Sequence, residues 1–414
     1  MPKRPSVVVV GGGFGGLEAA RALGGVDADV TLVDKKNHHC FQPLLYQVAT
    51  AALSPADVAW PIRSVLSSQQ NATVIMAEVS GIDLEACAVA TSDGLRIPFD
   101  YLILATGATS SYFGHPDWAQ YAPGLKTIED ATRIRARILS CFERAERLQD
   151  EASRQQAMTF AIVGGGPTGV ELAGAIADVA HNVLARDFRR VNPRSAKIFL
   201  LDAGKRVLPT FEEELSEYTR EALQKMGVEV LAGCSVTNVS EDCVTLSDGR
   251  RIDCCCTLWA AGVRASAAAA WLEAPADRAG RVIVDDSLRV SPHRNIFAIG
   301  DVAASTSEGK PVPGLAPAAK QMGQFVGSLI AQELSGESRK PEPFVYRHQG
   351  DLATIGRKSA VVSLRRIRLK GSPGWLFWSV VHIYFLIGLR NRITVAINWL
   401  WEYLTFQRGA RLIS

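Results

Sequence analysis

The chain has 414 residues, of which 47% are hydrophobic and 21% charged, and its formal net charge is +3. This composition is that of an ordinary globular protein, so it excludes a disordered chain and a protein with many membrane spans. The length favours two nucleotide-sized domains plus an appendage. The eight cysteines include no CxxC pair and no accompanying histidine run, so we expect neither a disulfide framework nor a metal site. Such cysteine usage suits a reducing compartment.

The first motif lies near the start of the chain, where a valine-rich strand, a glycine loop and a helical pattern follow one another. The loop carries Gly11-x-Gly13-x-x-Gly16. In such a loop the first glycine makes the tight turn, the second lets the backbone approach a pyrophosphate, and the third packs helix against strand. The next expected strand ends at Asp34, where a carboxylate can accept ribose hydroxyls. The sequence therefore predicts a dinucleotide site, with a plain glycine turn as the alternative.

The same pattern occurs a second time in the middle of the chain. Gly164-x-Gly166-x-x-Gly169 stands between an apolar strand and a helix, and a later strand ends at Asp202. The basic stretch 185–197 separates this helix from that strand, and we interpret it as a loop insertion. Two such units predict two bound dinucleotides.

Two further strand ends indicate which loop holds which cofactor. One strand ends at Thr106-Gly107 and another at Gly300-Asp301. Both resemble the closing motifs of the two-dinucleotide flavoproteins, in which the first loop holds FAD and the second a nicotinamide cofactor. In that family the matching aspartate accepts the ribityl hydroxyls, whereas a helix N-cap is the other interpretation of Asp301. A helix starting near Ala316 would direct its positive end at the flavin and stabilise the reduced form.

Hydride transfer between the two cofactors needs orientation, because the cofactors carry the chemistry. Glu171 is the best-placed candidate, since it follows Gly169 on the second helix; a first-turn glutamate that balances the helix dipole is the alternative. The disulfide reductases of this fold carry a redox cysteine pair after the first FAD unit, but Cys40 stands alone here. Sulfide-oxidising relatives need late cysteines, and none follows Cys256.

Several segments resemble the bacterial type II NADH:quinone oxidoreductases, and the similarity runs from about residue 6 to 413. These segments are residues 37–55, 258–263, 314–327, 352–361 and 381–413. The resemblance implies that Gln321 borders the quinone site, whereas an exposed helix glutamine is the plainer interpretation. Tyr46 and Gln47 could cover the flavin or pack beside it. The family usually has Glu where this chain has Asp202, and Lys205 follows, so NADPH tolerance stays open.

The loops and the resemblance together define the expected cofactor-binding residues. For FAD these are Gly11, Gly13, Phe14, Gly15, Gly16, Asp34, Lys35, Val79, Ala105, Thr106, Gly107, Gly300, Asp301 and Ala318. For NADH they are Gly164, Gly166, Thr168, Gly169, Asp202, Val236 and Gly262, beside Glu171.

The C-terminal tail is basic and rich in tryptophan. Residues 357–414 hold ten Lys and Arg against one acid, Glu402, and four of the eight tryptophans. The apolar run 375–389 has 15 residues, short of the roughly 20 needed to span a bilayer. After Gly388, polar residues recur every three or four positions and the rest of the helix is apolar. This pattern predicts a helix lying in the bilayer interface, and dimer packing would produce a similar one.

We therefore expect an α/β protein with two Rossmann-like dinucleotide-binding domains and a C-terminal amphipathic helical membrane anchor. The expected FAD domain comprises residues 1–115 and 290–350, the NADH domain 116–289 and the anchoring region 351–414. The expected reaction is hydride transfer from NADH to FAD N5, followed by two-electron reduction of a membrane quinone in a respiratory chain, without proton pumping. The protein would lie peripherally (monotopically) on the cytoplasmic side of the cell inner membrane.

The expected partners are a membrane quinone and the bilayer surface, with a homodimer possible and no nucleic acid. Two other functions stay open at this point. One is a soluble NAD(P)H-dependent flavoprotein reductase of another acceptor, and the other is a membrane sensor that binds both dinucleotides with low turnover.

Overall fold

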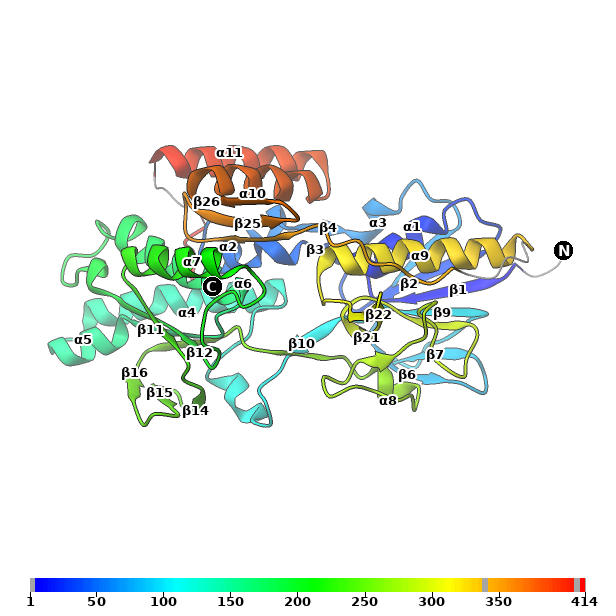
Figure 1. Ribbon diagram of the computed structural model, residues 1–414, viewed down its shortest axis with the longest axis horizontal. Helices are drawn as coiled ribbons and strands as arrows, with labels where there is room; N and C mark the ends of the chain where they lie inside the picture. Colours follow the sequence, from blue (N-terminus) through cyan, green and yellow to red (C-terminus); the bar gives the residue numbers. More distant parts are fainter. Residues whose placement is uncertain (1–3, 337–341, 406–409, 414) are drawn as a thin grey trace. The chain divides into compact units, whose positions relative to one another are not determined.

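The computed structural model describes residues 4–336, 342–405 and 410–413, and the chain forms two compact units (Figure 1). The first unit contains residues 1–40, 60–109 and 263–349, and the second contains residues 41–59, 110–262 and 350–414. Each unit is therefore assembled from three separate stretches of sequence. Short elements occur where the chain leaves one unit for the other: β3 (His38–Cys40), α2 (Leu45–Ala49), β4 (Ala59–Pro61), β10 (Ala108–Ser110) and β18 (Val263–Ala265).

A five-stranded parallel sheet in the order β20-β9-β1-β2-β5 forms the centre of the first unit. Its strands are β1 (Ser6–Val10), β2 (Asp29–Asp34), β5 (Ala72–Met76), β9 (Tyr101–Leu104) and β20 (Ile296–Ala298). The four valines of β1 are at most 4% exposed, as expected for a parallel strand covered on both faces. Helices α1 (Phe14–Ala22) and α9 (Ala316–Leu334) pack closely, because a Cβ on Gly323 would lie 2.1 Å from the carbonyl oxygen of Gly15.

A three-stranded antiparallel sheet of β6 (Val79–Asp83), β7 (Ala88–Thr91) and β8 (Arg96–Pro98) also belongs to the first unit. The shorter elements of the unit are α3 (Ile62–Val65), α8 (Ala268–Trp271), the parallel pair β19 (Val282–Ile283) and β21 (Ala303–Ala304), and the antiparallel pair β22 (Thr306–Ser307) and β23 (Lys310–Pro311). Residues 263–289, which the sequence analysis grouped with the NADH domain, belong to this unit. Their apolar side chains Ala268, Leu272 and Val282 join its buried core.

The second unit has its own parallel sheet, of four strands in the order β13-β12-β11-β17. These strands are β11 (Thr159–Val163), β12 (Lys197–Asp202), β13 (Val228–Ala232) and β17 (Cys256–Trp259), and the helices with them are α4 (Ile128–Arg147), α5 (Glu151–Ala157), α6 (Pro167–Asp178) and α7 (Glu213–Lys225). A separate antiparallel sheet contains β14 (Val236–Val239), β15 (Cys243–Leu246) and β16 (Arg251–Asp253). Both units thus contain a strand, a glycine loop and a helix, which confirms the α/β class and the two Rossmann-like folds.

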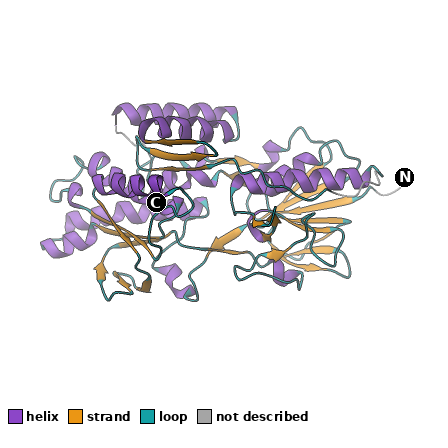
Figure 2. Cartoon of the chain, viewed as in Figure 1, coloured by secondary structure: helices purple, strands orange, loops and turns teal. Residues whose placement is uncertain are grey.

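The C-terminal part of the second unit is a three-stranded antiparallel sheet followed by two helices (Figure 2). The strands are β24 (Asp351–Thr354), β25 (Ala360–Leu364) and β26 (Ile367–Lys370), and the helices are α10 (Gly371–Phe385) and α11 (Leu389–Thr405). The helix predicted after Gly388 is confirmed. In the described parts of the chain, no helix combines the length and apolar character needed to cross a membrane. Of the tail's basic residues, Arg408 lies outside the described residues.

Candidate functional site

The glycine loop of the first unit lies against the end of β9. A Cβ on Gly11, whose φ is +106°, would lie 2.4 Å from the carbonyl oxygen of Ala105. A Cβ on Gly16 would lie 1.9 Å from the carbonyl oxygen of Gly11. At Gly13, in contrast, a Cβ would meet no atom within 4 Å, and no side chain caps the helix that starts there. The loop is therefore closed on the protein side and open over Gly13, where uncapped backbone N–H groups suit an anionic group.

Asp34 fastens this loop to the end of β2. Its Oδ2 atom accepts a hydrogen bond of 2.6 Å from the Gly12 backbone, and its Oδ1 atom accepts one of 2.7 Å from the Lys36 backbone. A carboxylate has about four lone-pair positions, so two such bonds leave room for ribose hydroxyls. The neighbouring Lys35 side chain is exposed.

His39 is a buried polar residue beside the loop that the sequence reasoning missed. Its Nδ1 atom donates to the carbonyl oxygen of Gly12 at 3.0 Å, and its ring makes an edge contact with Phe14 at 4.9 Å between centroids. Burial lowers the pKa of His39 to about 4, so the ring is neutral. Its Nε2 atom is buried and has no hydrogen-bond partner among the described residues. A buried acceptor of this kind suits the hydroxyl of a ligand. The only sequence signal was a histidine close after the strand-end acid.

Both predicted closing motifs lie at the same edge of the first sheet as the glycine loop, because β9, β20 and β1 are parallel. After β9, the Thr106 hydroxyl lies 2.5 Å from the Ser266 hydroxyl, and the Gly107 carbonyl accepts a 3.2 Å bond from the Ser266 backbone. After β20, Gly300 and Asp301 open a short turn. This carboxyl edge is where open α/β sheets bind ligands.

The remaining predicted FAD residues divide between this edge and the core. Ala318 is 1% exposed in the first turn of α9, and Val79 is the first residue of β6, where it packs against the buried core. Together the open loop, the unpartnered His39 nitrogen and the convergent strand ends fit a dinucleotide.

Gln321 has a more specific setting than an exposed helix glutamine. Its Nε2 atom donates to the Arg347 carbonyl at 3.0 Å, and its Oε1 atom accepts from the Arg347 backbone N–H at 2.9 Å. The side-chain amide thus pairs with the backbone of Arg347 as a neighbouring strand would. Its role at a quinone stays a prediction.

The second glycine loop repeats the first in detail. A Cβ on Gly164, whose φ is +114°, would lie 2.6 Å from the carbonyl carbon of Ala260, and a Cβ on Gly169 would lie 1.8 Å from the Gly164 carbonyl oxygen. The space over Gly166 is open within 4 Å, and no side chain caps α6. Like the first loop, this loop therefore requires glycine at its first and third motif positions, and the start of its helix is open.

Asp202 is positioned as Asp34 is. Its Oδ2 atom accepts from the Gly165 backbone and its Oδ1 atom accepts from the Gly204 backbone at 2.6 Å. The Lys205 side chain is exposed. The predicted loop insertion is confirmed over residues 185–196, where the only regular element is a short 3-10 turn at Pro193–Ser195.

Three other residues predicted to contact NADH belong to the second unit. Thr168 and Val236 are partly buried, and Gly262 follows β17 at the carboxyl edge of the sheet. Gly262 has a φ of +71°, and a Cβ there would lie 2.5 Å from the ring of Phe113. That ring is 67% exposed. The structure therefore places Gly262 and the glycine loop at one edge of the sheet.

Glu171 is buried on α6, and no acidic residue occupies the first turn of that helix. Burial raises its pKa to about 8, and the hydrogen bond from the Thr354 backbone opposes that shift. The carboxyl is therefore protonated for the most part at neutral pH, unlike a solvated glutamate that balances a helix dipole. The bond to β24 was not visible in the sequence, because Thr354 is 183 positions away.

A chain of buried hydrogen bonds links α11 to β24. Trp399 Nε1 donates to Gln47 Oε1 at 2.7 Å, Gln47 Nε2 donates to the Tyr46 hydroxyl at 3.0 Å, and that hydroxyl lies 2.8 Å from Thr354 Oγ1. A cavity of about 40 Å³ lies beside these residues, large enough for about one water molecule. Tyr46 and Gln47 are thus held by the tail and by the residue whose backbone binds Glu171.

Metal ligation has no support in the described ranges, where no group of three or more His, Cys, Asp and Glu side chains could hold an ion.

Two family models match the chain. The model described as pyridine nucleotide-disulphide oxidoreductase covers residues 5–323, and the NDH2 C-terminal domain covers residues 348–408. Among curated proteins, the type II NADH:quinone oxidoreductase Ndh of Mycobacterium tuberculosis is 42% identical over 425 residues, covering 100% of this chain and 91% of that protein. NdhA of the same organism is also 42% identical, covering 99% and 90%.

Solved structures agree on the fold. NDH2 from Plasmodium falciparum in complex with NADH is similar with a TM-score of 0.90 at 22% identity, covering 98% of this chain and 99% of that one. The sulfide:quinone oxidoreductase of Aquifex aeolicus is similar with a TM-score of 0.74 at 19% identity, covering 97% and 95%.

Proposed function

Since this chain belongs to the type II NADH:quinone oxidoreductases, we propose that its first glycine loop holds FAD and its second holds NADH. The resemblance inferred from the sequence segments is confirmed. The protein is an NADH:quinone oxidoreductase whose cofactors are FAD and NADH. FAD, when bound, supplies the acceptor for the hydride and the donor for the quinone. The residues of the chain bind and orient these cofactors and shield them from water.

In the first unit, the open backbone over Gly13 and the uncapped start of α1 receive the pyrophosphate. Asp34 accepts the ribose hydroxyls, and Asp301 accepts the ribityl hydroxyls. The Nε2 atom of His39, beside the loop, is buried and has no hydrogen-bond partner among the described residues, so it takes a further hydroxyl. The single observation that supports this assignment best is that each unit holds the same open loop fastened by a strand-end aspartate.

In the second unit, α6 receives the NADH pyrophosphate and Asp202 the adenosine ribose. Glu171 orients the nicotinamide, and its position is set by the backbone of Thr354. Gln321, on α9 of the first unit, borders the quinone.

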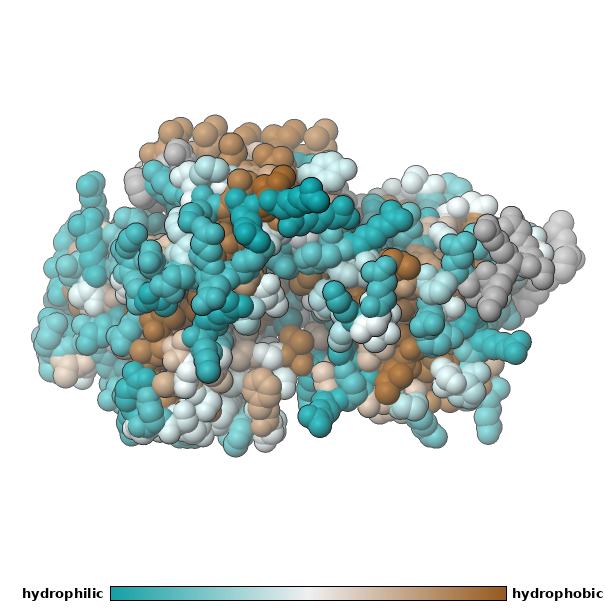
Figure 3. Space-filling view, in the orientation of Figure 1, coloured by the Kyte–Doolittle hydropathy of each residue, from teal (hydrophilic) through white to brown (hydrophobic). Residues whose placement is uncertain are grey.

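We also propose that α10 and α11 bind the bilayer surface. The polar stripe of α11 faces the protein: Asn391 is 5% exposed and donates to the carbonyls of Ala56 and Ala59, and Glu402 is 8% exposed. The exposed face is apolar, and Figure 3 shows it as a hydrophobic surface over these helices. Its side chains, each at least 37% exposed, are Leu376, Val380, Tyr384, Phe385, Leu389, Ile393, Ile397, Leu400, Trp401 and Leu404.

An exposed apolar patch of this size indicates an interaction surface, and the tail's basic residues favour an anionic leaflet. The same face could instead pair two copies of the chain.

Glycine substitutions test the assignment of the two loops. A Cβ at Gly13 or Gly166 meets no protein atom within 4 Å, so valine at either position fills the space that a pyrophosphate would use. We expect Gly13→Val to lose FAD, and Gly166→Val to retain FAD while its KM for NADH rises at least about tenfold. Gly81→Val is the matched control, because that position is also open and lies on β6.

The measurements are bound flavin per chain and NADH oxidation with a short-chain quinone. Normal flavin and KM in all three variants would contradict the loop assignment. Flavin binding with negligible quinone-dependent NADH oxidation in the unaltered protein would favour a sensor, and oxidation with only other acceptors would favour a soluble reductase.

A further inference from the structure

Two cysteines that are distant in sequence lie together in the second unit. Cys141 on α4 donates its thiol hydrogen to the sulfur of Cys255, and the two Sγ atoms are 2.8 Å apart. A disulfide needs a separation of about 2.05 Å, so less than 1 Å of approach would join them. Both thiols are reduced. The sequence analysis found no cysteine pair, because the partners are 114 positions apart.

The surroundings make Cys255 the nucleophile of the pair. Its side chain is partly exposed, whereas Cys141 is buried. The hydrogen bond from Cys141 lowers the pKa of the Cys255 thiol, and the positive charges of Arg144 and Arg137 lower it further. These arginines lie three residues after and four residues before Cys141 on α4, so they share its face of the helix. Donating this hydrogen bond raises the pKa of Cys141.

The backbone also holds Cys255 in place. Its N–H donates to the carbonyls of Gln156 and Thr159, each at 3.1 Å. Cys141 is fixed by the long helix α4, which packs on β17. The two sulfurs are therefore presented to each other by rigid backbone on both sides.

We propose that Cys255 and Cys141 form a modification site for hydrogen peroxide, with Cys255 as the reacting thiol and Cys141 as the resolving one. The Cys255 thiolate attacks one peroxide oxygen, an S–O bond forms, the O–O bond breaks, and water leaves after taking a proton. Cys141 then attacks the sulfenic sulfur, an S–S bond forms, the S–O bond breaks, and a second water carries away the thiol proton. Two thiols are oxidised by two electrons and one peroxide is reduced to two waters. A dithiol reductant reverses the modification by exchange.

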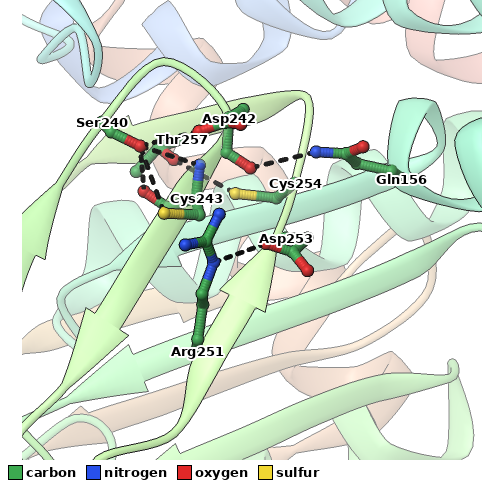
Figure 4. A network of polar contacts seen from close by, with 8 residues as sticks. All are labelled: Gln156, Ser240, Asp242, Cys243, Arg251, Asp253, Cys254 and Thr257. Carbon is green, nitrogen blue, oxygen red and sulfur yellow. Dashed lines mark hydrogen bonds and ion pairs between the residues drawn. The ribbon is translucent and has the colours of Figure 1, made fainter.

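The neighbouring cysteines Cys243 and Cys254 contact hydroxyl groups instead of another thiol (Figure 4). The sulfur of Cys243 lies 3.2 Å from the Ser240 hydroxyl, and that of Cys254 lies 3.4 Å from the Thr257 hydroxyl. Both side chains are buried, and burial raises the pKa of Cys254 to about 12. Cys256 also contacts Cys141, but its side chain is fully buried. Peroxide should therefore select Cys255, the partly exposed member of the run of three cysteines.

The test uses the full-length flavin-bound protein, treated with a small excess of hydrogen peroxide and then with catalase. We expect two of the eight thiols to be lost and recovered with dithiothreitol. Non-reducing tryptic mapping should join peptide 138–144 to peptide 252–264, with fragmentation assigning the bond to Cys141 and Cys255. A bond to Cys254 or Cys256, or no thiol loss, would overturn the proposal.

Variants identify the order of reaction. Cys141→Ser should form no cross-link and should instead trap a sulfenic acid on Cys255, which dimedone labels. Cys254→Ser is the matched control from the same run and should keep the cross-link. Dimedone labelling of another cysteine in Cys141→Ser, or loss of the cross-link in Cys254→Ser, would contradict the assignment.

Discussion

At the scale of a single side chain, we propose that Asp202 selects NADH over NADPH. Its carboxylate lies at the end of β12 and already binds two backbone N–H groups. A 2′-phosphate would bring further negative charge to this carboxylate, whereas a 2′-hydroxyl would donate to it. A hydrogen bond to a charged group contributes about 1.5–3 kcal/mol, so we expect kcat/KM to favour NADH by roughly tenfold or more.

The check is kcat/KM for both donors in the unaltered protein, in Asp202→Asn and in Lys205→Ala. The preference should shrink in Asp202→Asn and hold in Lys205→Ala, because that lysine is exposed. Equal constants for NADH and NADPH in the unaltered protein would place Asp202 away from the ribose.

Glu171 gives the protein a specific pH dependence. Burial raises its pKa from 4.5 to about 8, so the folded state holds this proton more tightly than the unfolded chain does. Its contribution to stability is complete below pH 4.5 and is lost as the pH rises through about 8, with a slope of up to about 1.4 kcal/mol per pH unit. We expect Tm of the unaltered protein to fall over this range relative to Glu171→Gln, whose amide does not titrate.

The same variant tests orientation of the nicotinamide. Glu171→Gln should retain its flavin and reduce it more slowly in stopped-flow mixing with NADH. If Tm of the unaltered protein and of Glu171→Gln changes with pH in the same way, Glu171 does not titrate between pH 4.5 and about 8. An unchanged rate of flavin reduction would show that Glu171 does not orient the nicotinamide.

At the scale of elements, a buried hydrogen bond connects α11 to α2. Trp399 Nε1 donates to Gln47, and phenylalanine at this position would leave that buried oxygen without its donor. Such a loss costs about 1–3 kcal/mol, so we expect Trp399→Phe to lower Tm by several degrees. Trp401→Phe is the matched control, since that ring is 56% exposed, and it should leave Tm nearly unchanged. Equal Tm values for the two variants would show that the bond contributes nothing.

The proposed membrane attachment depends on the exposed face of α11. Removing the whole tail would also remove Trp378 and Trp399, which are 1% and 8% exposed, and would open the core. Serine at Ile393, Ile397 and Leu400 instead removes apolar area without adding charge. Burial of each such side chain contributes up to about 1.5–3 kcal/mol, so we expect vesicle affinity to fall at least about tenfold.

Flotation with anionic vesicles and activity with a long-chain quinone are the measurements. Leu95→Ser and Ile283→Ser, at exposed apolar positions of the first unit, are the controls and should float normally. If the triple variant floats normally but changes from dimer to monomer, the face pairs two copies of the chain.

At the scale of the whole molecule, we expect one FAD per chain, held without a covalent bond. The loop, the strand ends and His39 offer hydrogen bonds and open space, which suit reversible binding. Acid precipitation should release the yellow colour to the supernatant. Colour that stays with the precipitated protein would contradict this expectation.

Much of the fold was predictable because its signals are local. A glycine loop between a strand and a helix follows from neighbouring residues, so both Rossmann-like units and the helix after Gly388 were found. The division of the chain was less accessible, since residues 263–289 join the core of the first unit through contacts distant in sequence. The partners of His39, Glu171 and Cys141 were hidden for the same reason. Burial and long-range pairing set their chemistry, and a single sequence displays neither.

The equivalence of Asp34 and Asp202 has a consequence for how two different ligands are told apart. FAD and NADH both contain adenosine diphosphate, and each loop offers the same fastened glycine turn and the same ribose acceptor to that common half. The loops alone therefore cannot discriminate between the two molecules. Discrimination must come from the parts that recognise the dissimilar halves. We propose that these are the strand ends at Thr106 and Asp301 in one unit and Glu171 in the other. Adenosine diphosphate, which has neither the flavin nor the nicotinamide ring, should accordingly compete for either site with little preference.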